Sequence, residues 1–299
     1  MTERDYMDVH AYNFDDLAQK EWNYPKIDMD ARGTQLLLKA TSPYAAIGRN
    51  PKGGRIKMDE IDRIAEHPDA KSVSIGGLQQ DTFEYFIKRY GRQFRYISFF
   101  DNALVEDWSL LETLPELEAL YWFHNQRITK LWDMSKSVSL RALEISDFCR
   151  LRDLTGIEKA PALEWFGFGD AVWRTSELDS LKPLAGTNIR RLSFTGKTIG
   201  DMDISFIPQM KTLEVFDFPT NLFTMEEVAW LVGKCPNVEG YALRPYIETN
   251  VYNNETNKAD IPGVLLVGKR KPMIAIEGNE KRIANHVAKF NKIVEENRK

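Results

Sequence analysis

Apolar positions return along this chain with a period of about two dozen residues. Each unit has an apolar residue at its first position, a second at its fourth and a third at its sixth. The eight units begin at Ala70, Phe94, Leu117, Leu140, Leu163, Ile189, Leu213 and Val238. Units of this length do not bury an apolar face alone, so we expect them to stack into one continuous core.

The clearest units resemble leucine-rich repeats, whose consensus is L-x-x-L-x-L-x-x-N. One unit runs through Phe94, Ile97 and Phe99 to Asn102, and the units at 117–125 and 213–221 fit equally well. The resemblance covers roughly 60–246, and the irregular units are similar to those of bacterial leucine-rich repeat proteins. It implies an α/β solenoid with short parallel strands on a concave face and short helices or 3₁₀ turns on a convex face.

The ninth position of each unit departs most from the consensus. Its Asn normally bonds to the backbone of the turn after the strand, and only Asn102, Asn125 and Asn221 supply it. The other units place Leu78, Phe148, Ala171, Lys197 and Tyr246 there. Cys149, one residue later, could serve if its turn shifts. The polar stretch 174–177 falls in the longest interval between units, so we interpret it as a loop insertion.

Three segments follow from this pattern. Residues 1–57 are expected to form an N-terminal extension and cap, with a short strand at 35–40 and a loop at 41–55. Residues 58–246 form the solenoid, beginning with a helix from Met58. Residues 247–299 form a C-terminal cap: a polar stretch to Asp260, then a hairpin of 264–267 with 273–276, then an amphipathic helix at 280–296.

Composition narrows the class of partner. The apolar fraction is 43% and the net charge is −4, values too ordinary to suggest binding to nucleic acid or an anionic membrane. The first residues lack a signal-peptide pattern and no apolar run reaches membrane-spanning length, so we expect a cytoplasmic protein. Cys149 and Cys235 lie three units apart, too far for a disulfide, and are expected to be free thiols.

The repeat predicts which positions of each unit lie on the concave face. Side chains alternate along a strand, so the third, fifth, seventh and eighth positions of each unit face the groove. An aromatic band and an acidic edge result. We predict that the groove binds a protein or peptide carrying basic and apolar groups, through Tyr96, Phe100, Asp101, Tyr121, Phe123, His124, Glu144, Asp147, Trp165 and Asp170. One version of this function is an inhibitor or immunity protein.

Two other interpretations of the same surface stay open. The aromatic band could be covered by residues 1–34 of the chain, whose isolated aromatic side chains otherwise have little to pack against. The row of Asp101, His124, Asp147 and Asp170 could bind a cation, although a solvated rim is the simpler interpretation and we predict no metal site.

Catalysis finds little support in the sequence. The four histidines lie in unrelated segments, neither cysteine has an activating neighbour, and 48–54 lacks the ending of a phosphate loop. We therefore expect a binding protein without catalytic residues or cofactor. The alternative is an enzyme whose flanking segments carry the catalytic residues and whose repeats serve as a scaffold.

Overall fold

The computed structural model describes residues 26–29, 45–46, 55–169, 176–196 and 198–298. The predicted strand at 35–40 lies outside these residues. Whether residues 1–34 cover the groove also lies outside them, because only the backbone of 26–29 is described there. Of the predicted loop at 41–55, residues 45–46 and 55 are described, the first two as backbone only. Within the described part no helix is long and apolar enough to cross a membrane.

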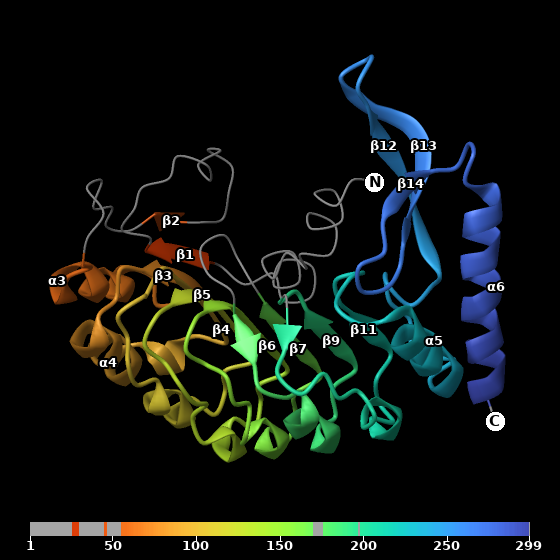
Figure 1. Cartoon of the computed structure of the whole chain (residues 1–299). Helices are drawn as coiled ribbons and strands as arrows, with labels where there is room; N and C mark the ends of the chain where they lie inside the picture. The colour runs from red at the N-terminus through yellow and green to blue at the C-terminus, as the bar shows by residue number, and fades with distance from the viewer. Residues whose placement is uncertain (1–25, 30–44, 47–54, 170–175, 197, 299) are drawn as a thin grey trace.

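The stacked units form one parallel sheet of nine strands (Figure 1). Its order is β11-β9-β7-β6-β5-β4-β3-β1-β2. Seven strands come from the units: β3 Ser72–Gly76, β4 Tyr96–Phe100, β5 Ala119–Asn125, β6 Ala142–Phe148, β7 Trp165–Gly169, β9 Arg191–Phe194 and β11 Val215–Asp217. Two more, β1 Lys26–Met29 and β2 Ala45–Ala46, extend the sheet beyond β3. The predicted α/β solenoid is confirmed.

The eighth unit departs from the prediction. Its expected strand is reduced to a single bridge between Val215 and Glu239. Gly240 allows the chain to pass close to the backbone of β11, because a Cβ at this position would lie 2.2 Å from the carbonyl oxygen of Phe216. The main sheet therefore ends at β11, and the chain turns into a different sheet.

The register of the sheet places equivalent residues of successive units side by side. Ile97 pairs with Leu120, Leu120 with Leu143, and Leu143 with Phe166. All four side chains are fully buried. Deeper in the same core, the ring of Trp122 lies 4.3 Å from that of Phe99, centroid to centroid. The fourth and sixth positions of the units thus build one continuous core, as the apolar period predicts.

The convex side is made of short elements, as predicted. The α-helices are α3 Met58–Asp62, α4 Gln80–Arg89 and α5 Met225–Lys234. The 3₁₀ turns are η3 Arg63–Glu66, η4 Gly91–Gln93, η5 Ser109–Thr113, η6 Met134–Lys136, η7 Ile157–Lys159, η8 Lys182–Gly186 and η9 Ile207–Gln209. Beside them β8 Glu177–Leu178 and β10 Thr198–Ile199 pair as a separate two-stranded sheet, and β8 begins at the last residue of the predicted insertion.

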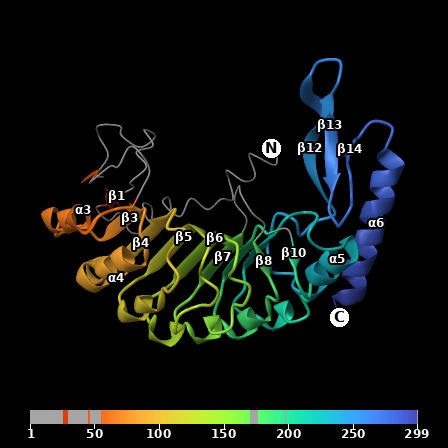
Figure 2. The same ribbon diagram turned by 60° about the vertical axis from the view of Figure 1, so that its left-hand side comes forward.

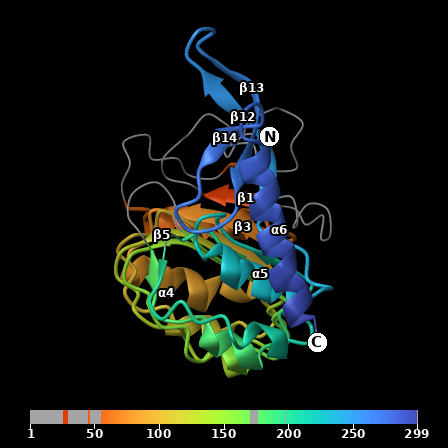
Figure 3. The ribbon, with the colours of Figure 1, turned by 45° about the vertical axis from the view of Figure 1, so that its right-hand side comes forward.

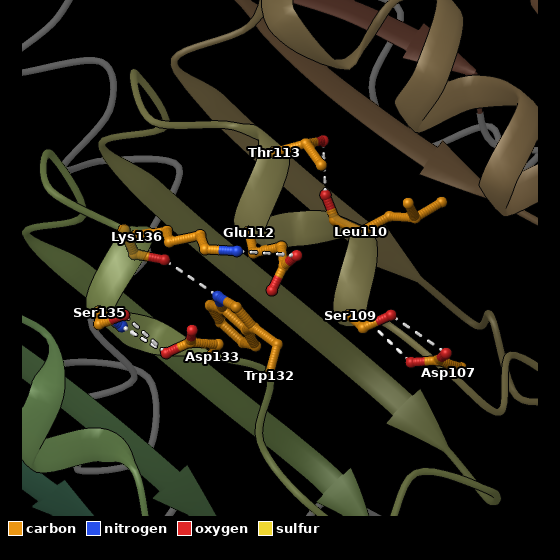
Figure 4. A network of polar contacts seen from close by, with 10 residues as sticks. Asp107, Ser109, Leu110, Glu112, Thr113, Trp132, Asp133, Ser135 and Lys136 are labelled. Atoms are coloured by element: carbon orange, nitrogen blue, oxygen red, sulfur yellow. Dashed lines mark hydrogen bonds and ion pairs between the residues drawn. The ribbon is translucent and has the colours of Figure 1, made fainter.

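A repeated aspartate begins several convex turns (Figure 4). The Asp107 carboxylate accepts the backbone N–H of Ser109 at 2.8 Å, and Asp133 accepts that of Ser135 at 3.2 Å. The same bond joins Asp153 to Thr155 and Asp203 to Ser205. An aspartate bonded to the backbone two residues on favours a turn over an extended chain. The spacing Asp-x-Ser/Thr is a second repeat signal in the sequence.

The asparagine ladder is present in two units and absent from the third. Asn125 is buried, donates to the carbonyls of Asn102 and Val105 at 2.9 Å, and accepts two backbone N–H groups at 2.8 Å. Asn102 likewise bonds to Leu78 and Ile75. Asn221, in contrast, is exposed. The expectation that it acts as a ladder residue is wrong, because the sheet ends at its strand.

The C-terminal part is a three-stranded antiparallel sheet followed by a helix. Its strands are β12 Tyr246–Asn253, β13 Lys258–Leu266 and β14 Met273–Ala275. The predicted hairpin corresponds to β13 and β14, but the interpretation of 247–260 as a polar connection is wrong. Helix α6 Glu280–Asn297 confirms the predicted helix and lies along α5, where Gly233 permits close approach to Val294 (Figures 1 and 3).

Candidate functional site

The concave face carries three rows of side chains at the third, fifth and seventh positions of the units. In the third-position row, Tyr96 pairs with Ala119, Ala119 with Ala142, and Ala142 with Trp165. These four residues form a hydrophobic cluster of their own, against which Tyr121 packs. The sheet separates this cluster from the main core. The protein thus has a second apolar cluster on the face that lines the groove.

Burial in this cluster differs from the sequence expectation. Tyr96 is 1% exposed and Trp165 is 6% exposed. The prediction that both rings stand out as exposed anchors is therefore wrong. The two alanines between them are small, so large rings at either side can pack down onto the sheet. Whether these rings bind a partner stays a prediction.

Half-buried aromatic rings form the seventh-position row. Phe100 and Phe123 pair across β4 and β5, and their rings stack with centroids 4.9 Å apart. Phe123 also lies beside His124, at 6.2 Å between ring centroids. Part of each ring is open to solvent. Phe100, Tyr121 and Phe123 are the aromatic residues of the predicted site that present accessible surface.

The acidic edge has a conformational origin. Gly77, Asp101, His124 and Asp147 occupy the eighth position in successive units, and all four have positive φ, between 57° and 75°. Side chains other than glycine adopt this left-handed region rarely, and Asp, Asn and His are enriched among those that do. The turn after each strand therefore accounts for the residue types in this row. Asp170 lies outside the described residues.

Two members of this row interact directly. Nδ1 of His124 contacts a carboxylate oxygen of Asp101, and Nε2 of His124 lies 3.0 Å from the amide nitrogen of Gln126. With a proton on Nδ1, the ring donates to Asp101 and accepts from Gln126. The His124 ring is thus fixed beside the Phe123 ring at the edge of the groove.

Asp147 differs from its neighbours in the row. It is 2% exposed, and its Oδ2 atom has no hydrogen-bond partner among the described residues. An unpartnered buried acceptor carries a desolvation penalty. No three His, Cys, Asp or Glu side chains in the described part are placed to hold one metal ion.

Glu144 lies in the fifth-position row, between Tyr121 of β5 and Gly167 of β7. A Cβ at Gly167 would lie 3.1 Å from Cγ of Glu144, so the glycine leaves room for the glutamate stem. Burial raises the pKa of the Glu144 carboxyl from 4.5 to about 8. A neutral carboxyl therefore stands on the concave face near neutral pH.

Sequence reasoning missed a ladder of charges at the start of the strands. From the second unit to the seventh, the residue at the second position is alternately Arg and Glu. The structure pairs these opposite charges across neighbouring strands. The ion pairs are Arg95 with Glu118 at 3.1 Å, Arg141 with Glu164 at 2.9 Å, and Arg190 with Glu214 at 2.6 Å. The signal was present as alternating Arg and Glu with the period of the units. This rim of the sheet is consequently close to neutral.

Stacked units, a parallel sheet in register and the asparagine ladder define the fold as a leucine-rich repeat solenoid. No protein-family model matches the chain, and no curated protein matches it. Among solved structures, the chain is similar to an internalin (inlF) from Listeria monocytogenes. The identity is 16%, the match covers 62% of this chain and 53% of the internalin, and the TM-score is 0.46. The match thus spans about half of the internalin, and at this identity partners and activities do not transfer.

Proposed function

We propose that the protein is an interaction scaffold whose concave face binds a protein or peptide partner. The observation that carries this proposal is the apolar surface on the outer side of the sheet, where a solenoid with a complete core needs none. Phe100 and Phe123 offer a stacked, half-open aromatic pair. Tyr121, two residues before Phe123 on the same face of β5, packs against the cluster that contains Trp165. Rigid aromatic surface of this kind supplies much of the binding energy at protein interfaces.

The partner is proposed to present a basic side chain beside an apolar one. Glu144 supports this, because a carboxyl whose pKa is raised to about 8 by burial gains most from a partner that supplies a positive charge. Insertion of a Lys or Arg would favour the ionised form and expel a proton from Glu144. Binding should therefore strengthen as pH is raised toward about 8, and this dependence should disappear in Glu144→Gln.

Inhibition of a basic partner, as in an immunity protein, is one form of this function and rests on the same surface. Catalysis by the flanking segments stays an alternative hypothesis. The two differ in what the groove does, because only the binding function requires the groove aromatics to contact another protein.

Affinity capture from cell extract tests the proposal. The immobilised full chain is compared with a Phe100→Ala/Phe123→Ala variant and with Val138→Ala, an exposed apolar residue in the loop before β6. Proteins retained by the wild type and Val138→Ala, but lost from the double variant, support binding at the concave face. Thermal unfolding verifies that the double variant is folded. Equal retention by all three chains would refute the proposal.

A further inference from the structure

The C-terminal sheet exposes a long unpaired edge. β12 has eight residues and, among the described residues, pairs only with β13, which leaves its other side without a strand from the described chain. The remaining edge strands of the described chain are short: β14 and β11 have three residues, and β2, β8 and β10 have two each. Figures 1 and 2 show β14 on the side of α6 and β12 on the opposite side, and the hairpin tip extends beyond the rest of the described chain. β12 is thus the most accessible edge.

The hydrogen bonds of β13 define which β12 groups point outward. The N–H of Leu266 donates to Pro272 at 3.2 Å, and the carbonyl of Pro262 accepts from Ile276 at 3.0 Å. Both groups therefore point away from β12. Leu266 lies opposite Tyr246, and Pro262 lies opposite Asn250.

In an antiparallel ladder, two opposed residues either exchange bonds or both point away from each other. Tyr246, Glu248 and Asn250 consequently direct their N–H and C=O groups to the open side, and Tyr252 continues the alternation. No protein group among the described residues bonds to these outward backbone groups. The edge therefore presents donors and acceptors in the spacing that another extended chain requires.

This edge lacks the usual protection. Monomeric proteins discourage pairing at free edges with lysine, proline or very short strands. β12 contains no Lys, Arg or Pro, and Glu248 is its single charged residue. One of the six exposed large apolar residues in the described part, Tyr252, lies on β12 itself. An unprotected edge that carries an exposed apolar side chain favours association.

We propose that β12 pairs in antiparallel fashion with β12 of a second copy of this chain, about a two-fold axis at Asn250. In this register Asn250 lies opposite Asn250 of the second copy, and Glu248 lies opposite Tyr252 of the second copy. A two-fold at Glu248 would instead place two carboxylates opposite each other, which is destabilising. The strand is self-complementary about Asn250, and pairing joins the two C-terminal sheets into one.

Self-pairing is independent of the proposed function, because the concave strands contribute nothing to it. Sedimentation velocity on the full chain over a range of concentrations is the test. The wild type is expected to show a reversible monomer–dimer equilibrium. Asn250→Lys and Asn250→Asp place like charges across the axis, so each should weaken dimerisation roughly tenfold or more. An equimolar mixture of the two variants should restore the dimer, since Lys then faces Asp.

Asn250→Ala and Asn250→Pro provide a matched pair for the backbone. Alanine keeps the outward N–H and should dimerise like the wild type, whereas proline removes that N–H twice per dimer and should weaken dimerisation roughly tenfold or more. A wild type that stays monomeric at all concentrations overturns the proposal. So does a dimer that is insensitive to both charge variants, which would place the interface elsewhere. A dimer that both charges weaken but mixing does not restore overturns the two-fold at Asn250.

Discussion

Backbone conformation explains the composition of the groove edge at the residue scale. The eighth position of four successive units is left-handed, and its occupants are Gly, Asp, His and Asp. A residue with a Cβ pays on the order of 1 kcal/mol or more in this region, unless its side chain compensates locally. The acidic row is therefore in part a requirement of the turn, whatever else it binds.

Asp147 provides a test of this requirement. Both Asp147→Gly and Asp147→Ala remove the buried carboxylate, but only glycine adopts a φ of 60° without strain. We expect the glycine variant to be more stable than the alanine variant by about 1 kcal/mol, measured by urea unfolding. Alanine at least as stable as glycine would contradict the conformational explanation.

Glu144 predicts a dependence of stability on pH. Because its pKa is about 8 in the folded chain and near 4.5 when unfolded, the folded chain holds the extra proton between these values. The contribution of the Glu144 carboxyl to the free energy of unfolding is therefore fully present below about pH 4.5 and is lost as pH rises to about 8.

The variant Glu144→Gln removes the titrating carboxyl, and comparison at a low pH, where both chains are neutral at this position, serves as the control. The variant and the wild type should have similar free energies of unfolding near pH 5, and the variant should be more stable at pH 8.5, by up to about 4 kcal/mol. Urea unfolding at both pH values measures the difference. A constant difference across this range would show that the carboxyl does not titrate there.

At the element scale, the ladder asparagines fix where each strand ends. Asn125 is buried and holds four backbone groups from the turns of two units. Asn125→Ala leaves these groups without partners, so we expect a loss of about 2 to 4 kcal/mol in the free energy of unfolding. Asn221 has the same place in the consensus but is exposed, so Asn221→Ala should change stability by less than about 0.5 kcal/mol. Similar losses in both variants would contradict the observed ladder.

The sequence allowed the strands and convex turns to be predicted because their apolar positions follow the period of the units. It did not reveal β12, whose side chains are mostly half-buried or exposed and whose sequence is polar. In the groove, register could be predicted from spacing, but burial could not. Whether the rings of Tyr96 and Trp165 are exposed or packed onto the sheet depends on Ala119 and Ala142, which lie on the two strands between them. Only the three-dimensional register brings these four residues together.

At the scale of the whole molecule, the solenoid presents two different surfaces. The concave face combines aromatic rings with a neutral carboxyl, and its rim at the strand starts is balanced by ion pairs between Arg and Glu. The hairpin of β12 and β13 lies at one end of the main sheet, and the free edge of β12 offers backbone groups instead of side chains (Figure 2). A side-chain surface suits selection of one partner, whereas a backbone edge suits pairing with an identical strand.

The central claim is that the concave face holds a protein partner through Phe100 and Phe123. The most direct test is calorimetric titration of the captured partner into the wild type and the Phe100→Ala/Phe123→Ala variant, with Val138→Ala as the control. Loss of both rings is expected to weaken binding roughly a hundredfold, while the control keeps the affinity of the wild type. Equal affinity for the wild type and the folded double variant would contradict the claim.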